Sequence, residues 1–96
     1  MLNDPAFNEF AQGLARRMKY DAAGGLKERL TLGYRLATSK LPTPDRVAEL
    51  ETLYTKLEKT YAADPAQMKG MAGTPDGAAF TVVASVLLNL DEALVR

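Results

Sequence analysis

The sequence contains no cysteine and no histidine, and its net charge is zero. Without these side chains there can be no disulfide, no thiolate metal site, no covalently attached c-type haem and no histidine general base. Its 12 basic residues are balanced by 12 acidic ones, so the excess positive charge that holds nucleic acid is missing. We therefore expect no cofactor, no metal and no nucleic-acid partner.

Long apolar runs are also lacking. The longest uncharged run covers residues 77–90 and is interrupted by Thr81, Ser85 and Asn89, whereas a membrane-spanning helix needs about 20 predominantly apolar residues. The first twenty residues carry several charges and no apolar stretch, so we expect no secretory signal. A chain of 96 residues can bury one modest core, and we interpret residues 1–96 as a single domain.

Prolines mark the expected helix starts. Four of the five prolines follow an Asp or a Thr, at residues 4–5, 43–44, 64–65 and 74–75. Asp and Thr side chains accept hydrogen bonds from the first free amides of a helix, and proline suits the next position because it has no amide hydrogen. A further start is expected near Asp21 or Gly25, and no segment has the pattern of a strand. The sequence predicts an all-α fold, a compact bundle of four or five short helices.

Apolar residues recur at steps of three and four, which places them on one face of each expected helix. The first helix would use Phe7, Phe10, Ala11, Leu14 and Met18, the third Val47, Leu50, Tyr54, Leu57 and Tyr61, and the last Phe80, Val83, Leu87, Leu90 and Leu94. The helix from about residue 26 to 40 has two candidate faces, Leu26, Leu30, Gly33 and Ala37, or Leu32 and Leu36, and we expect neighbours on both sides. The last helix is apolar over most of its circumference, so we expect it to be central.

One polar stripe remains on that last helix. Thr81, Ser85 and Asn89 are spaced four apart, and Asp91 and Glu92 follow them. The stripe could be the solvent-facing line of a buried helix, or a surface that packs on another protein. We take these five residues as the candidate interaction surface.

Other clusters suggest little chemistry. Arg16, Arg17 and Lys19 are expected at the end of the first helix, where cations complement the helix dipole, and an anion site is the alternative. Asp45 and Glu49 share a helix face that we expect to be solvated. No pairing of a nucleophile with a base is indicated, so we expect no enzymatic activity from this chain alone.

Three short motifs carry a resemblance to a known family. They are residues 2–5 (Leu-Asn-Asp-Pro), 41–44 (Leu-Pro-Thr-Pro) and 87–92 (Leu-Leu-Asn-Leu-Asp-Glu). Together and in this order they resemble the C-terminal part of a planctomycete-specific domain family associated with cytochrome-c-like domains. The resemblance implies a C-terminal module of a large periplasmic or envelope protein, with upstream domains as partners; any haem would belong to another domain.

Departures from the family pattern occur at three places. Ser39-Lys40 stands where the family commonly has Gly-Arg, Arg46 where it often has Glu, and Phe80 where it usually has Trp. A Glu at position 46 would have completed a capping box with Thr43, so we expect a weaker cap here.

The sequence thus predicts a non-catalytic packing or interaction module that binds upstream domains or another protein. Two alternatives stay open. The chain could contribute residues to an active site shared with upstream domains, in which case Arg29, Asn89, Asp91 and Glu92 are the candidates. It could also be a tetratricopeptide-like binding scaffold, because Leu57-Glu58-Lys59 leading to Asp64-Pro65 resembles the end of such a repeat.

Overall fold

The computed structural model describes residues 5–68, 71 and 73–90. Within these ranges the chain forms four α-helices, one short 3-10 helix and no strand. The elements are α1 (Pro5–Tyr20), α2 (Leu26–Thr38), α3 (Pro44–Ala63), the 3-10 helix η1 (Pro65–Met68) and α4 (Pro75–Leu88). The predicted all-α bundle is confirmed.

Thr-Pro pairs begin two of these helices as predicted. The Thr43 hydroxyl accepts the Arg46 amide at 3.1 Å, and the Thr74 hydroxyl accepts the Gly77 amide at 3.3 Å. Each bond satisfies one amide that the helix itself leaves free. The helix starts of α3 and α4 are therefore encoded locally, while Asp4, the expected cap of α1, lies outside the described residues.

The prediction of a full helix after Asp64-Pro65 is wrong. Asp64 does cap the turn, since its carboxylate accepts the Ala66 amide at 3.2 Å, but η1 is only four residues long. The sequence leaves too few residues before the segment 70–73, with its two glycines, to nucleate an α-helix. A tetratricopeptide-like arrangement would need a full helix at this point, so the fold does not support that alternative.

The start of α2 falls at Gly25, one of the two predicted positions. The Glu28 carboxylate accepts the Gly25 amide at 2.8 Å and so reaches back over the first turn. Asp21 instead follows the end of α1, where its carboxylate pairs with Arg17 at 3.0 Å.

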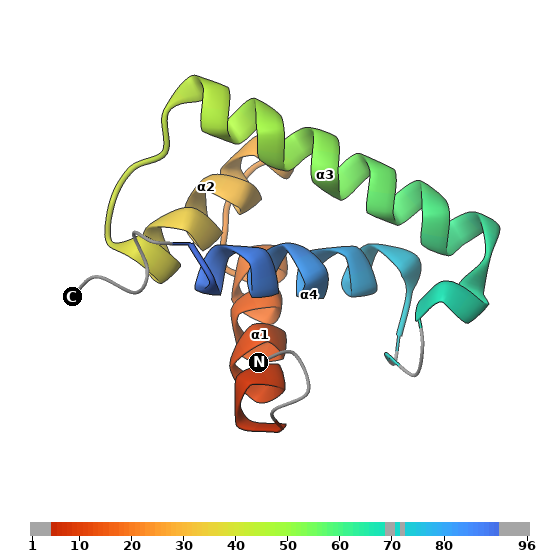
Figure 1. The fold of residues 1–96 in the computed structure, drawn as a ribbon. Coiled ribbons are helices and arrows are strands. Elements are labelled where there is room, and N and C mark those ends of the chain that lie inside the picture. Colours follow the sequence, from red (N-terminus) through yellow and green to blue (C-terminus); the bar gives the residue numbers. More distant parts are fainter. Residues whose placement is uncertain (1–4, 69–70, 72, 91–96) are drawn as a thin grey trace.

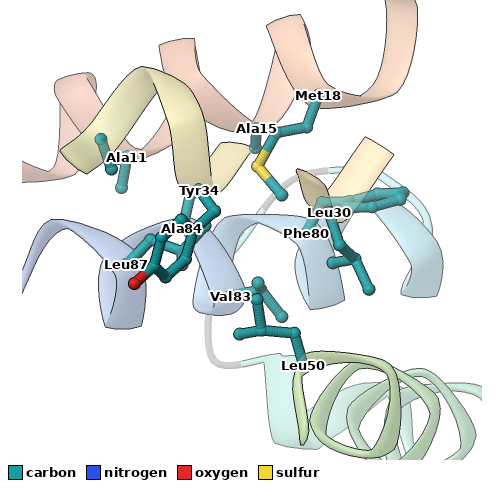
Figure 2. Packing of buried hydrophobic residues seen from close by; sticks show 11 residues of the cluster. Ala11, Ala15, Met18, Leu30, Tyr34, Leu50, Phe80, Val83, Ala84 and Leu87 are labelled. Carbon is teal, nitrogen blue, oxygen red and sulfur yellow. The ribbon is translucent and has the colours of Figure 1, made fainter. Parts of the chain in front are cut away.

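Helix α4 lies at the centre of the molecule, as predicted, and packs against α1, α2 and α3. In Figure 1, α3 runs along one side of α4 while α1 crosses it steeply. The close view in Figure 2 shows side chains of the other helices converging on α4. Its fully buried residues include Phe80, Val83 and Leu87. Phe80 also packs against Tyr54 of α3, with ring centroids 4.6 Å apart.

Two predicted apolar faces need correction. In α1 the buried line is Ala11, Ala15 and Met18, whereas Phe10 is 71% exposed because it lies about a quarter turn from Ala11. In α2 the buried face is the one containing Leu30, Gly33 and Ala37. On the other face Leu36 is exposed and Leu32 is half-buried, so that face is covered only in part, although α2 contacts α1, α3 and α4.

Helices α1 and α2 approach closely at Gly33. A Cβ at this position would come within 2.6 Å of the sulfur of Met18, a fully buried side chain that has no solvent to move into. We predict that Gly33→Ala lowers the free energy of unfolding by about 1 kcal/mol, because overpacking outweighs the better helix propensity of alanine. Urea denaturation measures the change.

Gly13→Ala is the matched control. A Cβ at Gly13 meets only the Arg16 side chain, at 3.9 Å, so this substitution should raise the free energy of unfolding by up to about 1 kcal/mol. Equal stabilisation by both substitutions would contradict the close approach.

Candidate functional site

The stripe predicted as an interaction surface is only partly accessible. Thr81 is half-buried, Ser85 is 8% exposed and Asn89 is exposed, while Asp91 and Glu92 lie outside the described residues. The interpretation of the stripe as a continuous solvent-facing line is therefore wrong at Ser85. This residue is small enough to be covered by the packing around α4.

Each polar side chain of the stripe bonds to its own helix. The hydroxyls of Thr81 and Ser85 donate to the carbonyls of Gly77 and Thr81 at 3.0 and 3.1 Å. The Asn89 amide donates to the carbonyl of Ser85 at 2.8 Å. These bonds to the residue four positions earlier satisfy the donors within α4. The hydroxyl donors of Thr81 and Ser85 therefore do not require a partner protein to form their hydrogen bonds.

The open side of α4 is centred on Val82 and Val86, each one residue after a member of the polar stripe. A shallow groove there is lined by Val82, Ser85, Val86, Asn89 and Leu90, and we call it the α4 groove. Val86 is 38% exposed, and no charged residue occurs between residues 77 and 90. Sequence reasoning identified the polar edge of this surface through Ser85 and Asn89 but missed its apolar centre. The continuous apolar pattern of the helix was the signal, but it does not say which side its neighbours leave open.

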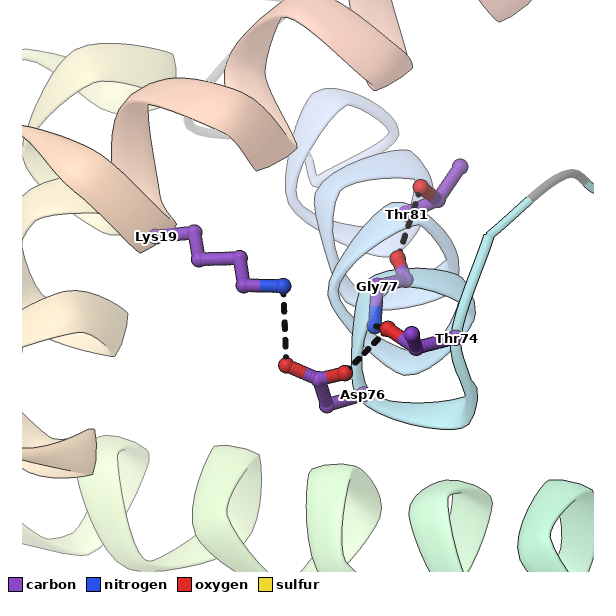
Figure 3. A network of polar contacts seen from close by, with 5 residues as sticks. All are labelled: Lys19, Thr74, Asp76, Gly77 and Thr81. Carbon is purple, nitrogen blue, oxygen red and sulfur yellow. Dashed lines mark hydrogen bonds and ion pairs between the residues drawn. The ribbon is translucent and has the colours of Figure 1, made fainter.

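A polar network surrounds the first turn of α4. The Lys19 ammonium of α1 lies 3.0 Å from the Asp76 carboxylate, whose other oxygen accepts the Thr74 hydroxyl (Figure 3). The Thr74 hydrogen bond, followed by Lys19, lowers the pKa of Asp76 against the opposing effect of burial. The hydrogen bond that Lys19 itself donates to Asp76 raises the pKa of Lys19. The pair thus ties the end of α1 to the start of α4.

The basic cluster at the end of α1 is divided between different partners. Arg17 pairs with Asp21 on the surface, Lys19 with Asp76, and Arg16 lines a groove between α1 and α4. Two of the three cations therefore have carboxylate partners. Asp45 and Glu49 are both exposed, as expected for a solvated helix face.

Arg29 and Asn89, two candidates for a shared active site, belong to different surroundings. The charge of Arg29 acts on Tyr54, whose pKa is nonetheless raised, first by burial and then by the charges of Asp76 and Glu58. The Nε atom of Arg29 is buried without a hydrogen-bond partner. Asn89 lies at the C-terminal end of α4, whereas Arg29 belongs to the first turns of α2. Among the described residues no hydrogen bond joins the two side chains. The structure does not assemble these two side chains into one site.

The described ranges contain no cluster of three or more acidic, cysteine or histidine residues that could hold a metal ion. None of the helices in the same ranges has the length and apolar content to cross a bilayer. Comparisons with protein-family models, curated proteins and solved structures found no match.

The Asp76 network predicts an acid-sensitive contribution to stability. Because the pKa of Asp76 is lowered by folding, its contribution is complete above the unfolded pKa of about 4 and disappears as the pH falls through the lower folded value. We expect Asp76→Asn to cost up to about 1 kcal/mol at pH 6, since the pair is partly exposed to solvent. The difference from the parent should shrink towards pH 2, as measured by urea unfolding across this range.

Asp45→Asn is the control for this experiment. Asp45 follows Thr43-Pro44 as Asp76 follows Thr74-Pro75, but no ion pair joins it to another described residue. A loss of stability at Asp45 as large as that at Asp76 would show that position in the first turn, rather than the Lys19 and Thr74 contacts, produces the effect.

Proposed function

We propose that this domain is a non-catalytic helical interaction module that docks another protein surface through the α4 groove. The observation that carries the proposal is the apolar character of the open side of α4, where Val82, Val86 and Leu90 stand in place of charged residues. Exposed helix faces in soluble domains are normally polar. An apolar face on the central helix is what a protein-binding surface requires.

The chemistry of the α4 groove favours packing over polar recognition. Ser85 and Asn89 bond internally to α4, so they contribute mainly their shape and the remaining acceptor capacity of the Asn89 amide. A small residue such as Ser85 at the edge lets a partner helix approach closely. Since a stable interface usually needs 20 or so residues on each side, neighbouring surfaces must take part with these five.

We also propose that the chain is related to the C-terminal part of the planctomycete-specific domain family that it resembles. In this proposal the partners are upstream domains of a larger protein. Support comes from a position where the sequences differ. Ser39 has a φ of 64°, in the left-handed region that glycine adopts without strain. The family commonly has glycine there, and Ser39 follows α2 at the position where helices most often end in glycine.

The left-handed backbone at Ser39 predicts that Ser39→Gly stabilises the domain. Glycine relieves the left-handed backbone of its side-chain clash, so the free energy of unfolding should rise by about 0.5–1 kcal/mol. Urea denaturation tests the change against Lys40→Gly, the neighbouring exposed position, which has an ordinary φ and should gain nothing. A destabilised Ser39→Gly variant would contradict the strain.

Site-specific photo-crosslinking tests the docking proposal. A photoreactive amino acid at Val86 should form one discrete adduct in cells of the source organism, whereas the same group at Thr55, on the exposed side of α3, should not. The adduct is identified by mass spectrometry, and binding of the purified partner to the purified domain is then measured directly.

The decisive comparison uses two arginine substitutions in that reconstituted assay. Val86→Arg places a charge in the apolar groove and should weaken binding by at least about tenfold. Thr55→Arg should bind like the parent. Both are exposed positions, so circular dichroism should show intact folding for each. Partner binding that survives Val86→Arg unchanged would exclude the α4 groove as the interface.

A further inference from the structure

A second groove lies on a different side of α4, between the end of α1 and the start of α4. We call it the α1–α4 groove. Its volume is about 440 Å³, within the range of roughly 300–1,000 Å³ that small-molecule sites occupy. From α1 it is lined by Arg16, Lys19 and Tyr20, and from α4 by Gly77, Phe80 and Thr81. None of the described acidic residues is among those that line it.

The charges around this groove are unequal. Lys19 is held 3.0 Å from Asp76, so its charge is largely balanced. Arg16 is exposed, and no ion pair joins it to another described residue. A guanidinium presents several donors in a planar fork that suits a carboxylate or a sulfonate. The groove therefore carries a net positive charge at Arg16.

The rest of the groove offers apolar and aromatic surface. Tyr20 is 72% exposed at one edge and the half-buried Met71 contributes to the wall, whereas Phe80 and Ala15 lie beneath it in the core. Gly77 has no side chain to fill the space beside Thr81, whose position one turn later on α4 is shown in Figure 3. The Gly77 amide is already bonded to Thr74. The Gly77 amide is therefore not free to bind an anion, and the proposal relies on Arg16 for that role.

From these observations we infer that the α1–α4 groove binds a small amphiphilic organic anion, with Arg16 holding the anionic group and Tyr20 and Met71 holding the apolar body. This site is independent of the α4 groove, because the two share no lining residue.

Octanoate is the probe, and two-dimensional amide NMR on the whole chain is the readout. Saturable shifts are expected at the amides of Ala15, Gly77 and Thr81. The neutral analogue octanamide should bind about tenfold more weakly, because it cannot form a charge-assisted bond with Arg16. Comparable affinity for octanamide would overturn the assignment of an anion site.

Two neighbouring arginines give the matched variants. Arg16→Gln should weaken octanoate binding by about tenfold. Arg17→Gln removes the same formal charge one residue away, from a side chain that pairs with Asp21 and does not line the groove, and should leave the affinity unchanged. Both positions are exposed, so both variants should fold. Absence of saturable shifts, shifts confined to other surfaces, or equal weakening by the two variants would each refute the proposal.

Discussion

The fold depends on one constraint, which is that α4 must be surrounded. From Gly77 to Leu90 the chain carries no charge, and a helix that is apolar around most of its circumference is stable in water only when other elements cover it. The three other helices meet this demand together. Small residues make the close packing feasible: α1 presents Ala11 and Ala15, and α2 presents Gly33 to the buried Met18. The hydrophobic core is thus a shell built around one helix.

Because the other helices cover most of α4, both proposed binding surfaces lie where α4 is left accessible. One lies at the start of the helix and the other along its open side. At its start, Lys19 of α1 contacts Asp76, which also bonds Thr74, and the space beside this contact forms the α1–α4 groove. Further along, the covering helices leave Val82 and Val86 partly open. Both proposed binding surfaces therefore follow from the same packing arrangement. Neither requires a catalytic group.

Local signals in the sequence predicted much of the fold. Thr43-Pro44 and Thr74-Pro75 begin helices because the capping bond and the missing proline amide act within a single turn. The central place of the last helix followed from its continuous apolar pattern. The errors arose where neighbours decide the outcome. Phe10 fits a loose helical periodicity, yet it is exposed because α1 turns its alanine line towards α4. Likewise, Ser85 is polar, yet neighbouring residues bury it. The Lys19–Asp76 pair joins residues far apart in the sequence, so no local pattern predicts it.

Native-state hydrogen exchange tests the central place of α4 most directly. If α4 is the helix that the others enclose, the amides of residues 80–87 should exchange only through global unfolding and be among the slowest in the chain. Amides on the exposed side of α3, around Thr55, should exchange through smaller openings. Exchange of the α4 amides faster than those of α1 and α2 would contradict the account, since it would show that α4 leaves the bundle while the rest stays folded.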